Sequence, residues 1–310
     1  MASIISWYGG KARMANQIIN IMPRHKTYVE VFGGGGHVLL NKPRAPLEVY
    51  NDLNKGLFCL FNTLRDEEAS KELQKQLQLT SYSKNEFDFA RNTWFNKYID
   101  IEKEIEDLKE AFEKGVIEKD TFEKELKNLE IELYKAQIDV ARMTYVLSTQ
   151  SFSATLNSWS RDLRGKTGLS PAVKKYLNGI DKNLPIVVNR MRTVQVENLS
   201  FEHILEKYDS KDTFFYLDPP YIHETREEGS TNVYNHEMDN SMHKMLVKIL
   251  LNLKGKFILS GYDHPIYDPL SEGKFKKVKL GSYAKTLAIP ESGEVPRGEE
   301  YIWINYNIGE

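Results

Sequence analysis

The stretch of this sequence best suited to chemistry is LDPPY, which ends at Tyr221. The apolar run Thr213–Leu217 predicts a buried strand, and the prolines after it cannot extend one because they donate no N–H to a ladder. Ligands of open α/β sheets bind at the carboxyl ends of the strands, where this turn would lie. We expect Asp218, whose ordinary pKa is about 3.9, to be ionised near neutral pH. Its carboxylate and the Pro219 carbonyl are two acceptors beside an aromatic ring, which favours a planar ligand with an NH2 group. An ordinary turn is the alternative.

A second candidate site is the glycine-rich turn Phe32–Gly36. Glycines let a ligand approach the backbone closely, and an acid after the next strand, here Asp52, can accept hydrogen bonds from a ribose diol. The dinucleotide fingerprint G-x-G-x-x-G fails because Val38 or Leu39 stands where its last glycine is needed, and no P-loop pattern is present. These residues favour a nucleoside cofactor without a bound pyrophosphate, with a structural turn as the alternative. The stretch SWYGGK, which ends at Lys11, could close over a carboxylate-bearing ligand.

Strand and helix signals alternate at both ends of the chain, which predicts a doubly wound, mostly parallel α/β sheet. A catalytic domain over 1–64 and 195–310 would be split by an insertion over 65–194. The predicted strands are Tyr28–Phe32, Leu47–Tyr50, Thr213–Leu217, Lys256–Ser260 and Tyr301–Tyr306, and the predicted helices of this core begin at Val38 or span Leu53–Leu64 and Met238–Leu253.

Within the insertion, apolar residues at steps of three and four predict a helical hairpin over about 97–140. Asp120 and Glu123 have the spacing of a capping box at the start of its second helix. Such a narrow apolar seam is typical of packing, and we assign it no catalytic role.

Composition favours a globular protein of the cytoplasm. Of 310 residues, 41% are hydrophobic and 28% charged. No apolar run approaches the roughly 18 residues of a membrane span, and the N-terminal residues lack a signal-peptide layout. The single cysteine, Cys59, excludes an internal disulfide. Seven scattered histidines, of which His236 and His243 lack a third ligand at matching spacing, predict no metal site.

The net charge of −2 is unevenly distributed. Residues 157–192 carry eight basic and two acidic side chains, whereas 97–139 carry eight basic and fourteen acidic ones. A basic segment can bind nucleic acid, although chance clustering on solvated faces gives the same pattern.

The ordered motifs SWYGGK, VEVFGGGGHVLLN, YNDLN and YLDPPY together resemble the DNA adenine-N6 methyltransferases of the Dam type, which belong to the D12 class. The late stretches KFILSGYD and EEYIWINYN are also similar to motifs of that family. The resemblance implies a Rossmann-like S-adenosylmethionine-dependent fold with a mainly helical target-recognition insertion. It also implies methyl transfer to adenine N6 in double-stranded DNA. Val31 and His37 depart from the usual residues of the family.

The resemblance also assigns roles to individual residues. The implied cofactor contacts are Trp7, Lys11, Phe32, Gly34, Gly36, Asp52 and Asp218, and the implied catalytic residues are Asp218, Pro219, Pro220 and Tyr221. The basic segment supplies the candidates for DNA binding, which are Arg161, Arg164, Lys166, Lys174 and Lys175.

Other functions remain open at this point. The same chemistry on cytosine N4, on RNA adenine or on a glutamine amide is the nearest alternative, and Asp at position 218 disfavours the cytosine and glutamine substrates by family resemblance. A DNA-binding relative without turnover is a rival of another class, but it need not retain the DPPY residues. A nucleotide-dependent oxidoreductase is disfavoured by the failed phosphate fingerprints. A membrane partner is not expected, and a monomer is compatible with the sequence.

Overall fold

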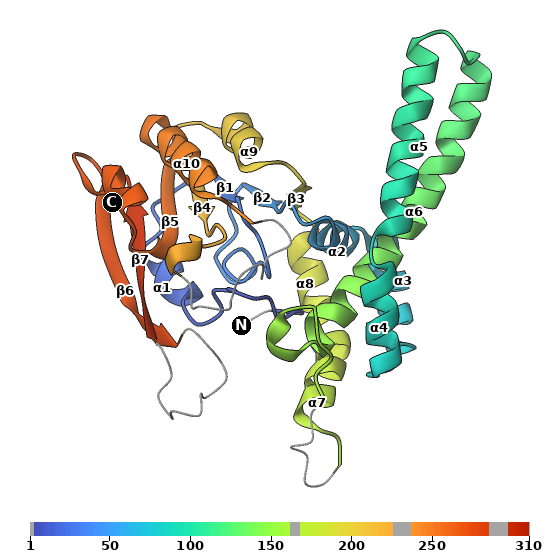
Figure 1. Cartoon of the computed structure of the whole chain (residues 1–310), viewed down its shortest axis with the longest axis horizontal. Helices are drawn as coiled ribbons and strands as arrows, with labels where there is room; N and C mark the ends of the chain where they lie inside the picture. The colour runs from blue at the N-terminus through green and yellow to red at the C-terminus, as the bar shows by residue number, and fades with distance from the viewer. Residues whose placement is uncertain (1–2, 162–167, 226–236, 285–296, 310) are drawn as a thin grey trace. The chain divides into compact units, whose positions relative to one another are not determined.

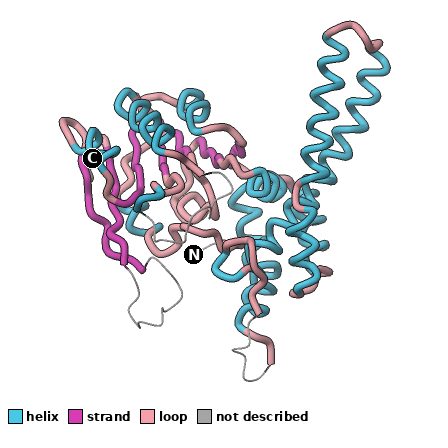
Figure 2. The backbone as a smooth tube through the Cα atoms, viewed as in Figure 1, coloured by secondary structure: helices cyan, strands magenta, loops and turns pink. Residues whose placement is uncertain are grey.

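The computed structural model describes residues 3–161, 168–225, 237–284 and 297–309, which form two compact units. The first unit comprises Trp7–Asn54 and the described residues from Thr193 onward, and the second comprises Ser3–Ser6 and Lys55–Arg192. All strands of the described residues lie in the first unit (Figures 1 and 2). No helix among them is long and apolar enough to span a membrane.

The described part of the first unit contains a seven-stranded sheet in the order β3-β2-β1-β4-β5-β7-β6. The first five strands in this order run parallel, whereas β7 is antiparallel to both β5 and β6. This mostly parallel α/β sheet confirms the predicted fold class. The strands are β1 (Thr27–Glu30), β2 (Leu47–Asn51), β3 (Val194–Glu197), β4 (Thr213–Leu217), β5 (Lys256–Tyr262), β6 (Lys276–Ala284) and β7 (Arg297–Ile304).

One face of this sheet is covered by α9 (Phe201–Tyr208), α10 (Asn240–Asn252) and the 3-10 helix η4 (Pro265–Ser271), which share a core with the strands. Helix α10 begins where the Asp239 side chain accepts a hydrogen bond from the Met242 N–H at 2.8 Å. The short helix α1 (Ala15–Asn20) precedes β1. The sheet therefore has a helical layer that fixes its strands and leaves their carboxyl ends to carry loops.

The helix expected to begin at Val38 does not form. Residues 37–41 form successive turns, and the Leu39 N–H donates to Oε2 of the buried Glu30 at 2.7 Å. Pro43 follows within five residues and restricts continuation of the turn. The glycine turn is therefore followed by an irregular segment that is tied to β1.

The second unit is helical in its described residues. Helices α5 and α6 pack as an antiparallel hairpin along the seam of Ile101, Ile105, Ala136 and Val140. The capping-box prediction was wrong, because the N-cap of α6 is Glu118, two residues before Asp120, and it makes no side-chain cap hydrogen bond. The helices are α2 (Lys55–Arg65), α3 (Glu67–Gln78), α4 (Lys84–Thr93), α5 (Asn96–Glu113), α6 (Lys119–Gln150), η1 (Phe152–Ala154), α7 (Pro171–Asn178), η2 (Gly179–Asn183) and α8 (Leu184–Met191).

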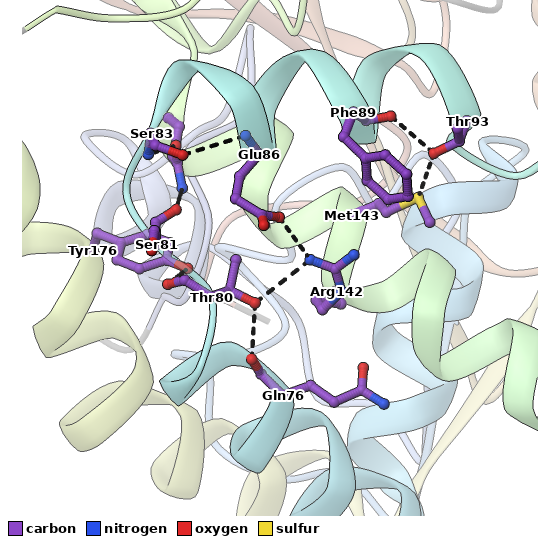
Figure 3. Close-up of polar contacts among 11 residues, drawn as sticks. Gln76, Thr80, Ser81, Ser83, Glu86, Phe89, Thr93, Arg142, Met143 and Tyr176 are labelled. Atoms are coloured by element: carbon purple, nitrogen blue, oxygen red, sulfur yellow. Dashed lines mark hydrogen bonds and ion pairs between the residues drawn. The ribbon is translucent and has the colours of Figure 1, made fainter.

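A polar network joins α6 and α7 to the connection between α3 and α4 (Figure 3). The Arg142 guanidinium reaches Oε2 of Glu86 at 3.2 Å, and the Tyr176 hydroxyl donates to the Thr80 carbonyl at 3.1 Å. Ser83 caps the first turn of α4. These bonds fix the position of α7, the helix that carries Lys174 and Lys175.

Candidate active site

The predicted site residues of the first unit follow three neighbouring parallel strands. The glycine turn follows β1, Asp52 follows β2, and Asp218 follows β4. Strand β1 pairs with β2 on one side and with β4 on the other, so the three carboxyl ends meet at one edge. The chain passes from β1 to β2 and β3 on one side of the sheet and then crosses to β4 on the other side of β1. This reversal of strand order makes the edge a topological switch point, where ligands of α/β sheets favour binding.

The glycine turn is held against Asp52. Gly34 has a φ of 50°, a left-handed value that suits glycine, and its N–H donates to Oδ2 of Asp52 at 2.8 Å. The other carboxylate oxygen of Asp52 accepts the Asn54 N–H at 2.8 Å. The Tyr50 hydroxyl donates to the Gly34 carbonyl at 2.8 Å. The acid expected to hold a ribose therefore also orders the turn.

Two glycine turns meet around Trp7 and His37. A Cβ atom placed on Gly34 would lie 3.0 Å from Cδ1 of Trp7. Cβ atoms on Gly10 and Gly35 would lie 3.0 and 2.6 Å from Cε1 of His37. The buried His37 ring thus packs between the SWYGGK turn and the glycine-rich turn. His37, which differs from the usual residue of the family at this position, therefore fills space between the two turns.

The DPPY turn carries a cluster of four polar side chains. Nζ of Lys11 lies 2.6 Å from Oδ1 of Asp218 and 3.7 Å from Oε1 of Glu300. The Tyr221 hydroxyl donates to Glu300 at short range and lies 3.4 Å from Oδ1 of Asp218. The Tyr221 ring meets the Tyr262 ring edge to face at 4.7 Å. One lysine thus lies between two carboxylates and below an aromatic ring.

Burial and charge set the protonation of this cluster. Burial raises the pKa of Asp218 to about 6, even though the neighbouring Lys11 ammonium acts to lower it. Burial acts to lower the pKa of Lys11, but the carboxylates of Asp218 and Glu300 raise it overall. Burial, together with both carboxylates, raises the pKa of Tyr221 well above its usual value. At neutral pH the Asp218 carboxyl is ionised, as expected, and Tyr221 keeps its proton.

The other predicted residues of this unit lie close to the same edge. Gly36 has a φ of 64° and continues the turn. The Phe32 ring is half-buried and lies 6.1 Å from the Phe201 ring in the core of the unit. Pro219 is buried and Pro220 half-buried behind Asp218.

The candidates for DNA binding lie in the second unit. Arg161, Lys174 and Lys175 are exposed, and Nζ of Lys175 donates to Oγ of Ser6 at 2.6 Å. Arg164 and Lys166 lie outside the described residues.

Sequence reasoning missed Glu300 and the buried Glu30. Glu300 lies on β7 opposite Tyr262 of β5, and its burial on the same strand face as Ile302 and Ile304 is unusual for an acid. An acid that interrupts an alternating apolar strand was the available signal. Glu30 accepts the Tyr28 hydroxyl at 2.7 Å, and burial raises its pKa to about 8.

The predicted residues of the first unit fall within a family match that spans nearly the whole chain. Residues 7–280 match the family model described as D12 class N6 adenine-specific DNA methyltransferase. The chain belongs to this D12 class. The match confirms the resemblance seen in the motifs, and D12 methyltransferases use S-adenosylmethionine. Glu300 lies beyond the matched residues.

One relative of the D12-class chain shares a shorter segment. Over 97 residues, or 31% of this chain, it is 32% identical to the DNA N-6-adenine-methyltransferase of Escherichia phage P1. The segment covers 13% of the phage protein, so the chain spans a small part of that relative.

Proposed function

We propose that this protein is an enzyme that transfers a methyl group from S-adenosylmethionine to the N6 amino group of adenine in double-stranded DNA. The observation that carries the proposal is the position of Asp218, whose half-buried carboxylate ends β4 beside the glycine turn of β1. Membership of the D12 class supports the same reaction.

The glycine turn suits the cofactor. Gly34 and Gly36 expose backbone without side chains, while Asp52 offers a carboxylate at the end of the adjacent strand to a ribose diol. Trp7 and Phe32 supply aromatic surface at either side of the turn, and Lys11 and Asp218 supply charge. When bound, S-adenosylmethionine supplies an electrophilic methyl group on a sulfonium.

Asp218 and Pro219 would orient the target amine. The lone pair of adenine N6 is delocalised into the ring, so the amine is a poor nucleophile. Accepting one N–H at the Asp218 carboxylate and the other at the Pro219 carbonyl favours a pyramidal nitrogen whose lone pair is free to attack. Such alignment removes several kcal/mol from a barrier. Pro220 stiffens the turn, and the Tyr221 ring provides a stacking surface.

The charge balance of the transfer follows directly. The N6 lone pair forms the new bond to carbon, the electron pair of the broken bond stays on sulfur, and the positive charge passes to nitrogen. The methylated nitrogen then loses a proton, because it is acidic while it carries this charge. Asp218 acts first as an orienting and electrostatic group, and with a pKa of about 6 it is also suited to receive that proton.

The target adenine must leave the duplex before it can meet Asp218. Flipping costs a few kcal/mol, and stacking on an aromatic ring returns about 1–3 kcal/mol per base. Contacts to phosphates supply more, and we assign these to Arg161, Arg164, Lys166, Lys174 and Lys175. Lys174 and Lys175 lie on the exposed side of α7.

The direct test is to locate a transferred label. Cofactor labelled on its methyl group is incubated with the protein and unmethylated duplex DNA of mixed sequence, and the DNA is digested to nucleosides. Label in N6-methyladenine is the expected result. Label in N4-methylcytosine would contradict the target, and label in RNA or protein alone would contradict the substrate. Cofactor and DNA binding without any transfer would identify a binding protein.

A further inference from the structure

Among the described residues, one ammonium and two carboxyl groups meet in the Asp218 cluster. Lys11 carries one positive charge, while two carboxylates face it, at 2.6 Å from Asp218 and 3.7 Å from Glu300. The side chains of Lys11 and Glu300 are only 5% and 4% exposed. The described side chains of this cluster therefore pair one cation with two acids, largely out of contact with water.

We infer that Glu300 is a positioning residue of this site, which places a second carboxylate beside Lys11 and holds Tyr221 and Lys11 around Asp218. The inference rests on the proposed function, because a second carboxylate complements a reaction that brings a cationic methyl donor to a neutral amine. Glu300 contacts Tyr221 and Lys11, and we expect it to act through these two neighbours.

The contacts of Glu300 support this role. It accepts the Tyr221 hydroxyl hydrogen bond, so it fixes the edge of the ring proposed to stack on adenine. Nζ of Lys11 lies 4.8 Å from the centroid of the same ring. Glu300 on β7 lies opposite Tyr262 on β5, and the Tyr262 ring contacts the Tyr221 ring. Glu300 thereby joins the DPPY turn to the antiparallel end of the sheet.

The other groups near Asp218 do not supply a second carboxylate at neutral pH. Glu30 on β1 is close enough to interact, but burial raises its pKa to about 8, so it is protonated. Tyr216 on β4 and Tyr267 on η4 also interact with Asp218, and burial raises the pKa of each, so both are neutral. Tyr221 is neutral for the same reason. Among the groups that these contacts identify, Glu300 is the second acid that lies within ion-pair distance of Lys11.

The matched variants are Glu300→Gln and Glu299→Gln. Glutamine keeps the volume of Glu300 and an acceptor for Tyr221 but removes the charge. Glu299 is the preceding residue of the same strand, is 53% exposed and pairs with Lys279. A third variant, Glu300→Asp, restores the charge and controls for packing.

Two measurements test the inference. The first is the NMR titration of the Asp218 carboxyl in protein labelled with ¹³C-aspartate, with the resonance assigned from Asp218→Asn. Because Glu300 acts to raise the pKa of Asp218, Glu300→Gln should move its midpoint to lower pH, whereas Glu299→Gln should not. The second is kcat against pH with duplex DNA. We expect Glu300→Gln to lower kcat at least about tenfold and to move the acidic limb to lower pH, and Glu300→Asp to restore the limb.

An Asp218 midpoint that is unchanged in Glu300→Gln, or a kcat profile that matches Glu299→Gln, would overturn the inference. Failure of the proposed function gives a different result, because wild-type protein would then transfer no label to adenine. In that case the NMR titration, which needs neither cofactor nor DNA, still decides whether Glu300 sets the charge at Asp218.

Discussion

Nζ of Lys11 lies 2.6 Å from Oδ1 of Asp218, although 207 positions separate the two residues in the sequence. The contact joins the N-terminal turn to the end of β4. Both side chains are largely removed from water, so each charge depends on the other. The turn that carries Lys11 is therefore joined to the DPPY cluster, and its ammonium opposes the rise that burial causes in the pKa of Asp218.

Replacing Lys11 with Met should destabilise the protein in a pH-dependent way. The change leaves two buried carboxylates without their cation, and loss of one partner of a buried pair costs about 3–5 kcal/mol. Because Lys11 holds down the pKa of Asp218, the variant raises that pKa above about 6. A raised pKa of an acid in the folded state removes stability as pH increases, so the loss should be larger at pH 8 than at pH 5.

Urea unfolding of Lys11→Met at these two pH values provides the measurement. Lys26→Met is the control, because Lys26 forms an ion pair with Asp212 in which both side chains are more than half exposed. An equal loss of unfolding free energy at pH 5 and pH 8 would show that Lys11 contributes packing rather than charge.

Glu30 should make the protein less stable as pH rises from 6 to 8. Burial raises the pKa of Glu30 from 4.5 to about 8, so the folded state retains a proton that the unfolded state releases. The unfolding free energy should therefore fall by about 2–3 kcal/mol across this window. Glu30→Gln removes the titrating proton and should flatten the dependence of the unfolding free energy on pH between 6 and 8. Glu68→Gln, at an exposed residue of α3, should leave this dependence unchanged. A fall in Glu30→Gln as steep as in the wild type would show that another group titrates.

We expect Gly34→Ala to weaken cofactor binding by more than its loss of folding stability explains. Alanine at a φ of 50° costs about 1–2 kcal/mol of backbone strain. The added Cβ would also lie 3.0 Å from Cδ1 of Trp7, so the turn or the tryptophan must move. Calorimetry should show at least about tenfold weaker binding of S-adenosylmethionine.

Gly115→Ala is the matched control for that change. Gly115 ends the first helix of the hairpin with a φ of 72° and has nothing within 4 Å of an added Cβ. It incurs a similar backbone strain, so it should lower the melting temperature without changing cofactor affinity. Equal cofactor affinity in Gly34→Ala and in the wild type would remove the glycine turn from the cofactor site.

The main parallel strands could be predicted from the sequence because each is a short apolar run closed by polar residues. Thr213–Leu217 coincides with β4, and the start of β2 at Leu47 was also correct. The helix expected at Val38 failed for a tertiary reason: the Leu39 N–H bonds to the carboxylate of Glu30. A local pattern does not contain that bond.

The residues of the candidate site were predictable to different degrees. Asp218 and the glycine turn carry short motifs at strand ends, and those motifs place them in the sequence. Glu300 becomes part of the cluster only through the pairing of β7 with β5, which sets Glu300 opposite Tyr262. The local sequence shows only that this acid is unusual on an apolar strand. Its partners could not be assigned, because strand pairing between distant segments is not encoded in local spacing.

Lys174 and Lys175 should contribute phosphate contacts if α7 faces DNA. Double replacement with Ala should weaken DNA binding and reduce the slope of log K against log salt by about 0.9 for each lost contact. Lys182→Ala, at another exposed lysine of the same unit, is the control and should keep the wild-type slope. A double variant with the wild-type slope would exclude α7 from the DNA surface.

The most direct test of the account is a comparison of Asp218→Asn with Asp212→Asn in a single-turnover assay with saturating cofactor and duplex DNA. The two acids flank β4 on either side, and Asp212 is exposed and paired with Lys26. We predict that Asp218→Asn retains cofactor binding but transfers methyl at least about a hundredfold more slowly, because its amide carries no charge to stabilise the N6 cation. Asp212→Asn should match the wild type. A transfer rate for Asp218→Asn within a few-fold of the wild type would contradict the assignment of this carboxylate as the centre of the reaction.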